Sequence, residues 1–205
     1  MKFEESETIK NLRTAFLAES GAMNEYNFFA TQAKTDGFEY VAKTLNTFAL
    51  NEKAHAEIWF KLYHGIAGTT DNLTSSIDLE NYERTVMYAE FAEKAREEGF
   101  SDIAELFDGV AKVEGAHEKT YNELLKKIKN GKMFEGNKDT VWKCANCGHV
   151  YVGKTAPEKC PVCSHPQALF YETQGQNYRT VYAFQPPRVS PRRLKRQIYF
   201  LQFFF

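Results

Sequence analysis

Two short stretches of the chain place a histidine three residues after a glutamate. Glu52 and His55 lie in NEKAHAE, and Glu114 and His117 lie 62 residues later in VEGAHEK. Because residues i and i+3 share one face of a helix, each pair presents a carboxylate and an imidazole in the same direction. Both groups suit first-row metals such as iron and manganese. One such pair usually marks a solvated helix face, so it is the repetition that indicates a metal site.

Two further stretches supply the carboxylates that would face these pairs. Glu19 lies in FLAESGAMNEY, and Glu80 and Glu83 lie in LENYERTVMY. One glutamate from each of two helices, with Glu-x-x-His from each of two others, is the ligand set of a two-metal carboxylate site in helical bundles. The carboxylates would also neutralise two divalent cations in an apolar interior, where unpaired charge is costly.

The two copies of this pattern differ just after the first glutamate. The offset of 62 residues pairs Tyr26 with Tyr88, but it pairs Glu19 with Asn81 instead of Glu80. We expect the additional residue of the second copy to be absorbed by a single-turn π-bulge, a feature that is common at functional sites.

Glu83 has no counterpart in the first copy, where the offset falls on Gly21. It is therefore a seventh candidate ligand, and a surplus carboxylate on one side would let a metal change partners with its oxidation state. Tyr26 and Tyr88 are predicted to line the site and to donate hydrogen bonds to ligating carboxylates. Packing in the core is an equally good explanation for the two tyrosines.

Four helices must position these residues. Residues 6–35 contain no proline, and their apolar side chains recur at three- and four-residue steps or multiples of them, which predicts an amphipathic helix. Further helices are expected over residues 39–62, from about 78 to 98, and over 101–128, with HGIAGTTDNLTSS as a connection. Since one hairpin exposes its apolar stripe, two copies of it predict a four-helix bundle.

All four cysteines lie in a separate part of the chain. The motifs CANCG and CPVC give the spacing C-x2-C, twelve residues, C-x2-C. Four thiolates at these spacings form a tetrahedral site for zinc or iron. Zinc would make the site structural, whereas iron would carry one electron. The predicted ligands are Cys144, Cys147, Cys160 and Cys163.

Charge is distributed unevenly along the 205 residues. The chain has 26 lysines and arginines and 27 aspartates and glutamates, but residues 174–205 hold six of the bases and no acid. Residues 1–173 thus carry 20 bases and 27 acids, a net charge of −7. Such an acidic body does not suit nucleic acid, which binds basic surfaces. Since no apolar run reaches membrane-spanning length and the first residues lack a signal-peptide core, we expect a cytoplasmic protein.

Residues 179–205 form a basic and aromatic tail of unusual composition. The run QPPRVSPRRLKR is typical of a disordered segment, and IYFLQFFF is apolar. A basic stretch beside an apolar end would suit a membrane surface. The alternative is an end altered by a frame shift or by cloning, and we favour it because nothing earlier in the chain prepares a membrane role.

Over residues 5–178 the chain resembles the rubrerythrin family. The motifs that carry the resemblance are AFLAES, NEKAHAE, ENYERTVMY, AREEGF, VEGAHEK, WKCANCG and APEKCPVC. The resemblance implies an all-α ferritin-like four-helix bundle followed by a small, mostly β and turn, rubredoxin-like four-cysteine metal domain. The expected boundaries are 1–135 for the diiron bundle, 139–178 for the rubredoxin-like domain and 179–205 for the tail.

The resemblance also implies a role for each candidate ligand. Two non-haem irons would occupy the bundle, with Glu19 and Glu80 as terminal ligands and Glu52 and Glu114 as bridges. One iron would stay on His117, and the other would move between Glu83 and His55 when the oxidation state changes. The four cysteines would hold a single iron, or zinc in a purified sample. The expected catalytic residues are Glu83, His55, Tyr26 and Tyr88.

The activity implied by the resemblance is the reduction of hydrogen peroxide to water in oxidative-stress defence. Electrons would come from NAD(P)H through a separate reductase or rubredoxin and would reach the diiron site through the thiolate-bound iron. The protein would be a homodimer, and a short connection between the second and third helices would favour swapped helical hairpins. The alternatives are a non-enzymatic iron-storage protein and a metal-binding protein with a zinc-ribbon module.

Overall fold

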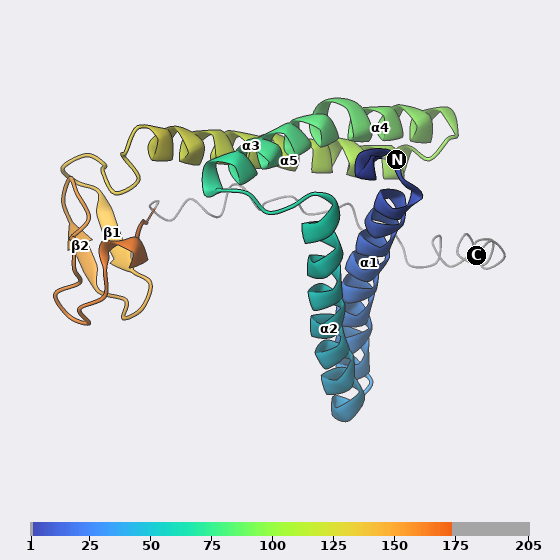
Figure 1. Cartoon of the computed structure of the whole chain (residues 1–205), viewed down its shortest axis with the longest axis horizontal. Coiled ribbons are helices and arrows are strands. Elements are labelled where there is room, and N and C mark those ends of the chain that lie inside the picture. The colour runs from blue at the N-terminus through green and yellow to red at the C-terminus, as the bar shows by residue number, and fades with distance from the viewer. Residues whose placement is uncertain (1, 174–205) are drawn as a thin grey trace. The chain divides into compact units, whose positions relative to one another are not determined.

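The structure is a computed structural model, and it describes residues 2–173. The predicted tail, residues 179–205, lies outside the described residues. Figure 1 shows helices first along the chain and short strands after them. Two compact units are present, one ending at Gly68 and the other beginning at Thr69. Within residues 2–173, no helix is both long enough and apolar enough to cross a membrane.

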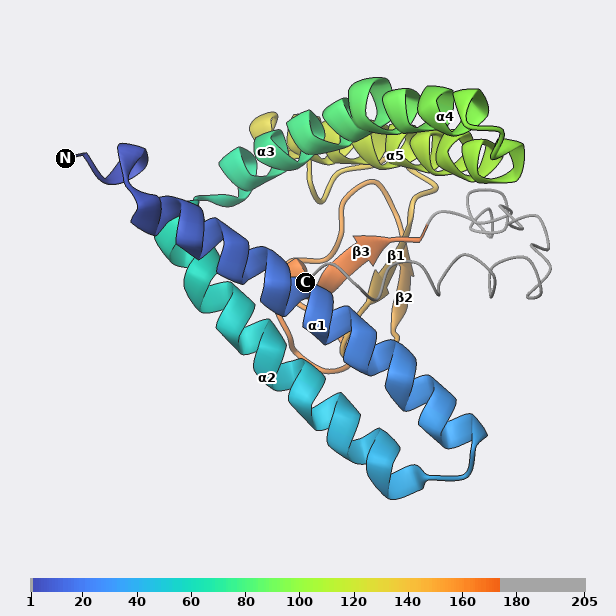
Figure 2. The same ribbon diagram turned by 90° about the vertical axis from the view of Figure 1, so that its right-hand side faces the viewer.

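The first unit is a helical hairpin. After a 3-10 turn at Phe3–Glu5, α1 (Glu7–Thr35) and α2 (Glu39–Tyr63) lie side by side in both views (Figures 1 and 2). The Ser6 hydroxyl caps α1 by accepting a backbone N–H of the first turn at 3.3 Å, which satisfies a donor that the helix leaves unpaired. Gly37 has a φ of +84°, a conformation that costs glycine little, and it reverses the chain between the helices.

The second unit begins with a second helical hairpin. Its first arm consists of α3 (Thr69–Tyr82), the π-helical turn η2 (Glu83–Met87) and α4 (Tyr88–Glu97). Its second arm is α5 (Ser101–Lys129), which packs against all three segments of the first arm. The turn η2 lies where the second copy of the repeat has its additional residue, so the predicted π-bulge is confirmed.

Small residues bring the arms of both hairpins together near their turns. In each hairpin three buried alanines form a cluster with one larger apolar side chain, which is Leu45 in the first and Phe107 in the second. Alanine allows two helix axes to approach closely, because side-chain size sets the distance between them. The two sets match residue by residue at the offset of 62: Ala30, Ala33 and Ala42, then Ala92, Ala95 and Ala104.

The connection between the hairpins is shorter than the sequence predicts. We expect a loop over HGIAGTTDNLTSS and a helix start near residue 78, but α3 begins at Thr69 and leaves only residues 64–68 as the connection. The hydroxyls of Thr74 and Ser76 donate to backbone carbonyls four residues earlier, at 2.9 and 3.0 Å. Because α3 packs against α5, tertiary contact outweighs the modest helix propensity of threonine, serine and asparagine.

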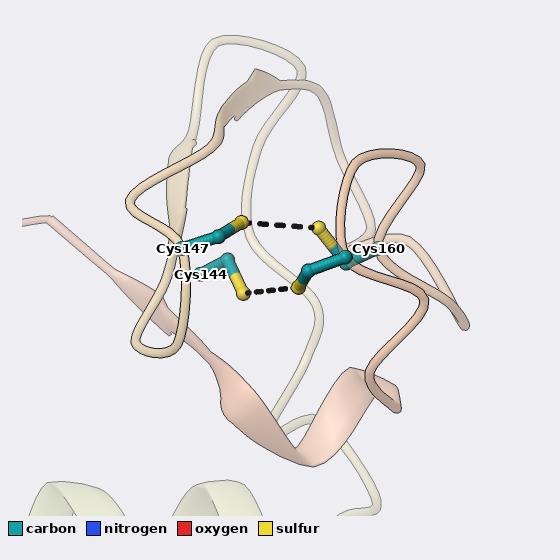
Figure 3. Close-up of side chains that lie close together, drawn as sticks. Cys144, Cys147 and Cys160 are labelled. Carbon is teal, nitrogen blue, oxygen red and sulfur yellow. Dashed lines mark hydrogen bonds between the residues drawn. The ribbon is translucent and has the colours of Figure 1, made fainter.

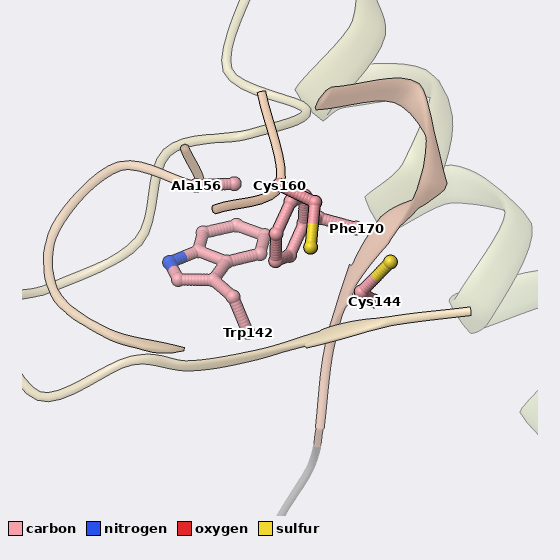
Figure 4. Close-up of a cluster of buried hydrophobic side chains, with 5 residues drawn as sticks. All are labelled: Trp142, Cys144, Ala156, Cys160 and Phe170. Atoms are coloured by element: carbon pink, nitrogen blue, oxygen red, sulfur yellow. The ribbon is translucent and has the colours of Figure 1, made fainter. Parts of the chain in front are cut away.

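The four-cysteine domain is a small antiparallel sheet with turns around it. Strands β1 (Val141–Cys144), β2 (Val150–Val152) and β3 (Phe170–Glu172) are arranged in the order β2-β1-β3, and a 3-10 turn at Gln167–Leu169 precedes β3. Its core is formed by five buried residues, drawn in Figure 4: Trp142, Cys144, Ala156, Cys160 and Phe170.

Trp142 is the largest side chain of this core and is 1% exposed. Its indole Nε1 donates to the Gly153 carbonyl at 2.9 Å, so the one polar atom of the ring is satisfied. The ring lies beside Phe170 and near Cys160 (Figure 4). Two of the four cysteines are thus fixed by packing before any metal binds. The chain has the predicted fold class: a helical part made of two hairpins, then a small strand-and-turn domain with four cysteines.

Candidate metal centres

The first hairpin brings together three of the predicted ligands. Glu19 projects from α1, and Glu52 and His55 project from α2. One ligand atom from each of the three lies within 4.8 Å of the others. His55 Nδ1 is 2.9 Å from Glu52 Oε2 and 3.9 Å from Glu19 Oε2. Two carboxylates and one imidazole therefore converge on a single point, as the i, i+3 spacing requires.

The second hairpin repeats this arrangement. Glu80 comes from α3, and Glu114 and His117 come from α5. Their ligand atoms also lie within 4.8 Å of one another. His117 Nδ1 is 2.7 Å from Glu114 Oε2 and 3.5 Å from Glu80 Oε2. Six of the seven predicted oxygen and nitrogen ligands thus form two equivalent groups, one in each hairpin.

Glu83, the seventh candidate, begins the π-helical turn η2 and belongs to neither group of three. It is nevertheless close enough to Glu114 for their charges to interact. Burial, and then the charge of Glu114, raise the pKa of Glu83 above its usual value. Burial also raises the pKa of Glu80. A hydrogen bond with Glu114 and the charge of Glu114 raise it further. Three crowded carboxylates favour a bound cation, and oxygen and imidazole donors fit iron.

Tyr88 immediately follows η2 and lies beside these carboxylates. Burial raises its pKa, and the charges of Glu83, Glu114 and Glu80 act in the same direction. Its ring also packs against Phe91 and Phe107. The Tyr88 ring therefore packs against aromatic neighbours, its phenol is within electrostatic reach of three carboxylates, and its role at the site stays a prediction. Tyr26 is half-buried on α1, and its role stays a prediction.

The four cysteines converge on one point in the strand-and-turn domain (Figure 3). Cys144 Sγ is 3.7 Å from Cys163 Sγ, and Cys147 Sγ is 3.6 Å from Cys160 Sγ. These separations are too long for disulfides and match the edges of a tetrahedron of thiolates around one metal ion. Cys144 and Cys160 are buried, whereas Cys147 is exposed.

Two matching turns hold the four sulfurs. In the first turn the Cys144 N–H donates to the His149 carbonyl at 2.9 Å, and in the second the Cys160 N–H donates to the His165 carbonyl at 2.8 Å. Each turn passes through a residue of positive φ, which is Gly148 in the first and Ser164, at +60°, in the second.

Backbone donors favour negative charge on the sulfurs. A backbone hydrogen bond at His165 lowers the pKa of Cys163 to about 5, and neighbouring thiols act in the same direction. At Cys147 a backbone hydrogen bond at His149 acts to lower the pKa, but partial desolvation of the sulfur and hydrogen bonds with the other three cysteines outweigh it and raise that pKa to about 12. The sulfurs thus share their protons unequally, and one thiolate is already favoured, as metal binding requires.

One polar network beside the second ligand group was not predicted from the sequence. Arg84 Nε donates to Glu118 Oε2 at 3.0 Å, and Asn81 Nδ2 donates to Glu118 Oε1 at 3.1 Å. Each of these three residues directly follows a predicted ligand in the sequence. That adjacency, absent around the first group, was a signal in the sequence that could have revealed them.

Family models match most of the chain. The rubrerythrin model matches residues 10–71 and 71–156, and the model of the rubrerythrin rubredoxin-like domain matches residues 142–171. The chain belongs to the rubrerythrin family. Rubrerythrins are oxidoreductases of oxidative-stress defence that carry a diiron carboxylate site and a four-cysteine rubredoxin-like site. The two glutamate–histidine groups and the four-cysteine group supply donors of the kinds that these sites need.

Similar proteins cover nearly the whole described chain. Rubrerythrin of Porphyromonas gingivalis is 41% identical over 186 residues, which cover 84% of this chain and 92% of that protein. Rubrerythrin of Nitratidesulfovibrio vulgaris is 42% identical over 186 residues, with coverages of 84% and 97%. A solved structure, the partially reduced state of nigerythrin, is 28% identical and covers 81% of this chain and 86% of its own, with a TM-score of 0.33.

Proposed function

We propose that this rubrerythrin is a non-haem diiron peroxidase that reduces hydrogen peroxide to water. The observation that supports this most is the presence, in one chain, of two glutamate–histidine groups and a four-cysteine group. The first two groups suit a pair of irons, and the third suits a one-electron carrier. Storage of iron would need no such carrier. We propose residues 1–135 as the diiron domain and 139–178 as the electron-carrier domain.

The proposed ligand roles are those that the resemblance to rubrerythrins implies. Glu19 and Glu80 are proposed as terminal ligands, Glu52 and Glu114 as bridges, and His117 as a constant ligand. His55 and Glu83 are proposed as alternatives for the second iron. When bound, the two irons supply two electrons, so that one hydrogen peroxide and two protons give two waters. Every other task in the reaction falls to the side chains around them.

Tyr88 is proposed to hold a proton next to the site. Burial and the charges of three carboxylates raise the pKa of Tyr88, and both causes favour the protonated phenol. A protonated phenol can donate a hydrogen bond to a carboxylate ligand and fix its orientation. Tyr26 is proposed for the equivalent task on the first hairpin, where it occupies the offset position.

The four-cysteine site is proposed to pass electrons, one at a time, from a donor to the diiron site. The rubredoxin-like domain suggests electron-transfer partners, and an NAD(P)H-dependent reductase or a rubredoxin is the donor we propose. Cys147 is exposed, and so are Val150, Tyr151 and Val162 in the same domain. An exposed apolar surface beside a buried redox centre suits brief contact with a donor protein.

We further propose a cytoplasmic homodimer that exchanges helical hairpins. A connection of residues 64–68 is too short for many arrangements of one hairpin on the other, and short hinges favour domain swapping. The first hairpin also leaves large apolar side chains half exposed or more, among them Phe28, Phe29, Phe48 and Leu50. A second copy that covers them would remove apolar surface from water.

Peroxide stoichiometry tests the proposed function. Protein loaded with iron, fully reduced and kept without oxygen should consume one hydrogen peroxide per two bundle irons, followed by loss of the four-cysteine iron's electron. A second equivalent should react only after a reductant is added. Reduced protein that leaves peroxide unchanged would overturn the peroxidase, and a colourless protein with zinc on the cysteines would overturn the relay.

A further inference from the structure

The network of Arg84, Asn81 and Glu118 is adjacent in the sequence to the predicted ligands of the second hairpin. Each of these ligands is followed directly by a member of the network or by Gly115, which lies against the Arg84 side chain. The consecutive pairs are Glu80–Asn81, Glu83–Arg84, Glu114–Gly115 and His117–Glu118. Since successive residues point about 100° apart around a helix, the network lies on the face next to the ligands. Any movement of the network is therefore passed to the ligands through a single peptide unit.

The Glu118 carboxylate is the centre of this network. Its Oε2 accepts from Nε of Arg84 at 3.0 Å and also lies 3.0 Å from the second guanidinium nitrogen. Its Oε1 accepts from the Asn81 amide at 3.1 Å. The Glu118 side chain is 20% exposed and that of Arg84 is 38% exposed. A fork-shaped, partly buried, charge-assisted contact of this kind is stronger and more directional than a surface ion pair.

Gly115 provides the space that the network needs. A Cβ atom at this position would lie 2.9 Å from Cδ of Arg84, so the arginine stem crosses α5 at a residue that lacks a side chain. Glycine in a helix interior is unfavourable compared with alanine. The first hairpin has Lys53 at the offset position, and it has the buried Ala56 where the second has Glu118. The network therefore belongs to the second hairpin alone.

The location of Arg84 explains why the second hairpin needs such a network. Arg84 is the second residue of η2, the π-helical turn that follows Glu80 and contains Glu83. A π-turn is a local departure from regular helix geometry, so its ligand can shift more easily. The contact between Arg84 and Glu118 joins this turn to α5 and so restrains it.

We propose that Arg84, Asn81 and Glu118 form a clamp that fixes the π-helical turn against α5 and keeps the carboxylates of Glu80 and Glu83 in position for metal binding. The clamp residues are positioning residues, because they act through the ligands beside them. This inference rests on the proposed function only in treating those glutamates as metal ligands.

Cobalt(II) binding tests the clamp without any turnover. Wild-type protein, Glu118→Gln and Arg84→Gln, each with zinc on the four cysteines and no metal on the glutamate–histidine groups, are titrated with cobalt(II), and the visible absorption band reports both the affinity and the ligand geometry. The affinity should fall about tenfold to a hundredfold in both variants, as happens when partners of metal ligands are removed. The charge-exchanged double variant, Arg84→Glu with Glu118→Arg, should regain most of the affinity.

Asp108→Asn is the matched control. It breaks another arginine–carboxylate contact in the same hairpin, between Arg96 and Asp108, which joins α4 to α5 away from the ligands. This variant should lower the melting temperature of the metal-free protein but leave cobalt affinity unchanged. If Glu118→Gln keeps wild-type affinity, or if Asp108→Asn weakens it equally, the clamp is wrong. A wild-type protein that binds no cobalt would overturn the proposed function as well.

Discussion

The two helical hairpins hold the same glutamate–histidine group in different surroundings. His55 in the first hairpin is 51% exposed, and His117 in the second is 39% exposed. The facing carboxylates differ more, because Glu19 is 29% exposed and Glu80 only 14%. The second hairpin also has Glu83, the π-turn and the Arg84–Glu118 contact. Repeating an element thus preserved the ligands while one copy acquired a more enclosed and more constrained site.

This difference suggests a division of labour between the hairpins. A ligand held by packing and hydrogen bonds suits a metal that stays in place, whereas an exposed imidazole suits one that changes partners. The difference arises from one additional residue within a helix. The turn η2 accommodates this residue and brings Glu83 close enough to Glu114 for their charges to interact, while the alanine contacts farther along the hairpin are kept. The comparison can be tested by measuring metal affinity, turnover in a cysteine variant and the stability of the metal-free protein.

The largest difference is expected between the two histidines. His117→Ala should weaken the binding of two cobalt(II) ions more than about a hundredfold. This loss exceeds the one expected when a residue that only hydrogen-bonds a metal ligand is removed. His55→Ala should weaken it much less, because Glu83 can replace the lost imidazole. Cobalt titration of both variants measures this. Equal losses of cobalt affinity in the two variants would contradict the proposed difference between the two histidines.

The second prediction separates the helical part from the cysteine domain. Cys160→Ser should leave the first reaction of reduced protein with peroxide intact, because that reaction uses electrons already stored on the diiron site. Sustained turnover with an external reductant should fall by about a hundredfold or more, since a hard oxygen ligand replaces a thiolate at the carrier. Stopped-flow and steady-state assays on one sample compare the two. Parallel loss of both activities would contradict the relay.

Smaller effects are expected in the stability of the metal-free protein. The pKa of Glu83 is raised above its usual value, so the stability linked to this group is present below the usual pKa and is lost as the pH rises through the folded-state pKa. Glu83→Gln should therefore stabilise the protein at neutral pH, by less than about 1 kcal/mol because solvent screens the group. Urea unfolding at about pH 5 and about pH 8 should show the larger gain at the higher pH.

Glu57 in the first hairpin is the control of opposite sign. A hydrogen bond from Lys61, and then its charge, lower the pKa of Glu57 below its usual value. Stability linked to Glu57 is therefore present at neutral pH and is lost as the pH falls. Glu57→Gln should slightly destabilise the protein at the higher pH and leave it unchanged in acid. Stabilisation by both variants would indicate a general charge effect and not the crowding of Glu83.

The smallest expected effect compares the two cysteine turns. Ser164 has a φ of +60°, whereas the matching residue of the first turn is Gly148 at +77°. Ser164→Gly should stabilise the domain by a few tenths of a kcal/mol. Glycine relieves the strain of the positive φ, but part of this gain is lost because glycine also increases the conformational entropy of the unfolded chain. Gly148→Ser should cost about 1 kcal/mol. Thermal unfolding of the zinc-loaded domain in the full chain would measure both, and a stabilising Gly148→Ser would refute this account.

The sequence predicted which candidate ligands come together in each hairpin, because their spacing follows helix geometry. Glu52 with His55, and Glu114 with His117, had to share a face once the helices were placed, and the slipped position of Glu80 correctly located the π-turn. It predicted the start of α3 poorly, since residues 69–77 are polar and become helical through packing against α5. The Arg84–Glu118 contact depends on which residues of two separate helices meet, and a single helix pattern does not contain that information.

The central claim is that the two glutamate–histidine groups together bind a pair of irons. Anomalous diffraction at the iron edge, from crystals grown without oxygen, tests it most directly. We predict two iron peaks about 3.5–4 Å apart, bridged by Glu52 and Glu114, and a third peak among the four cysteines. Two peaks far apart, each bound only by the ligands of one hairpin, or no peak beside His117, would contradict the account.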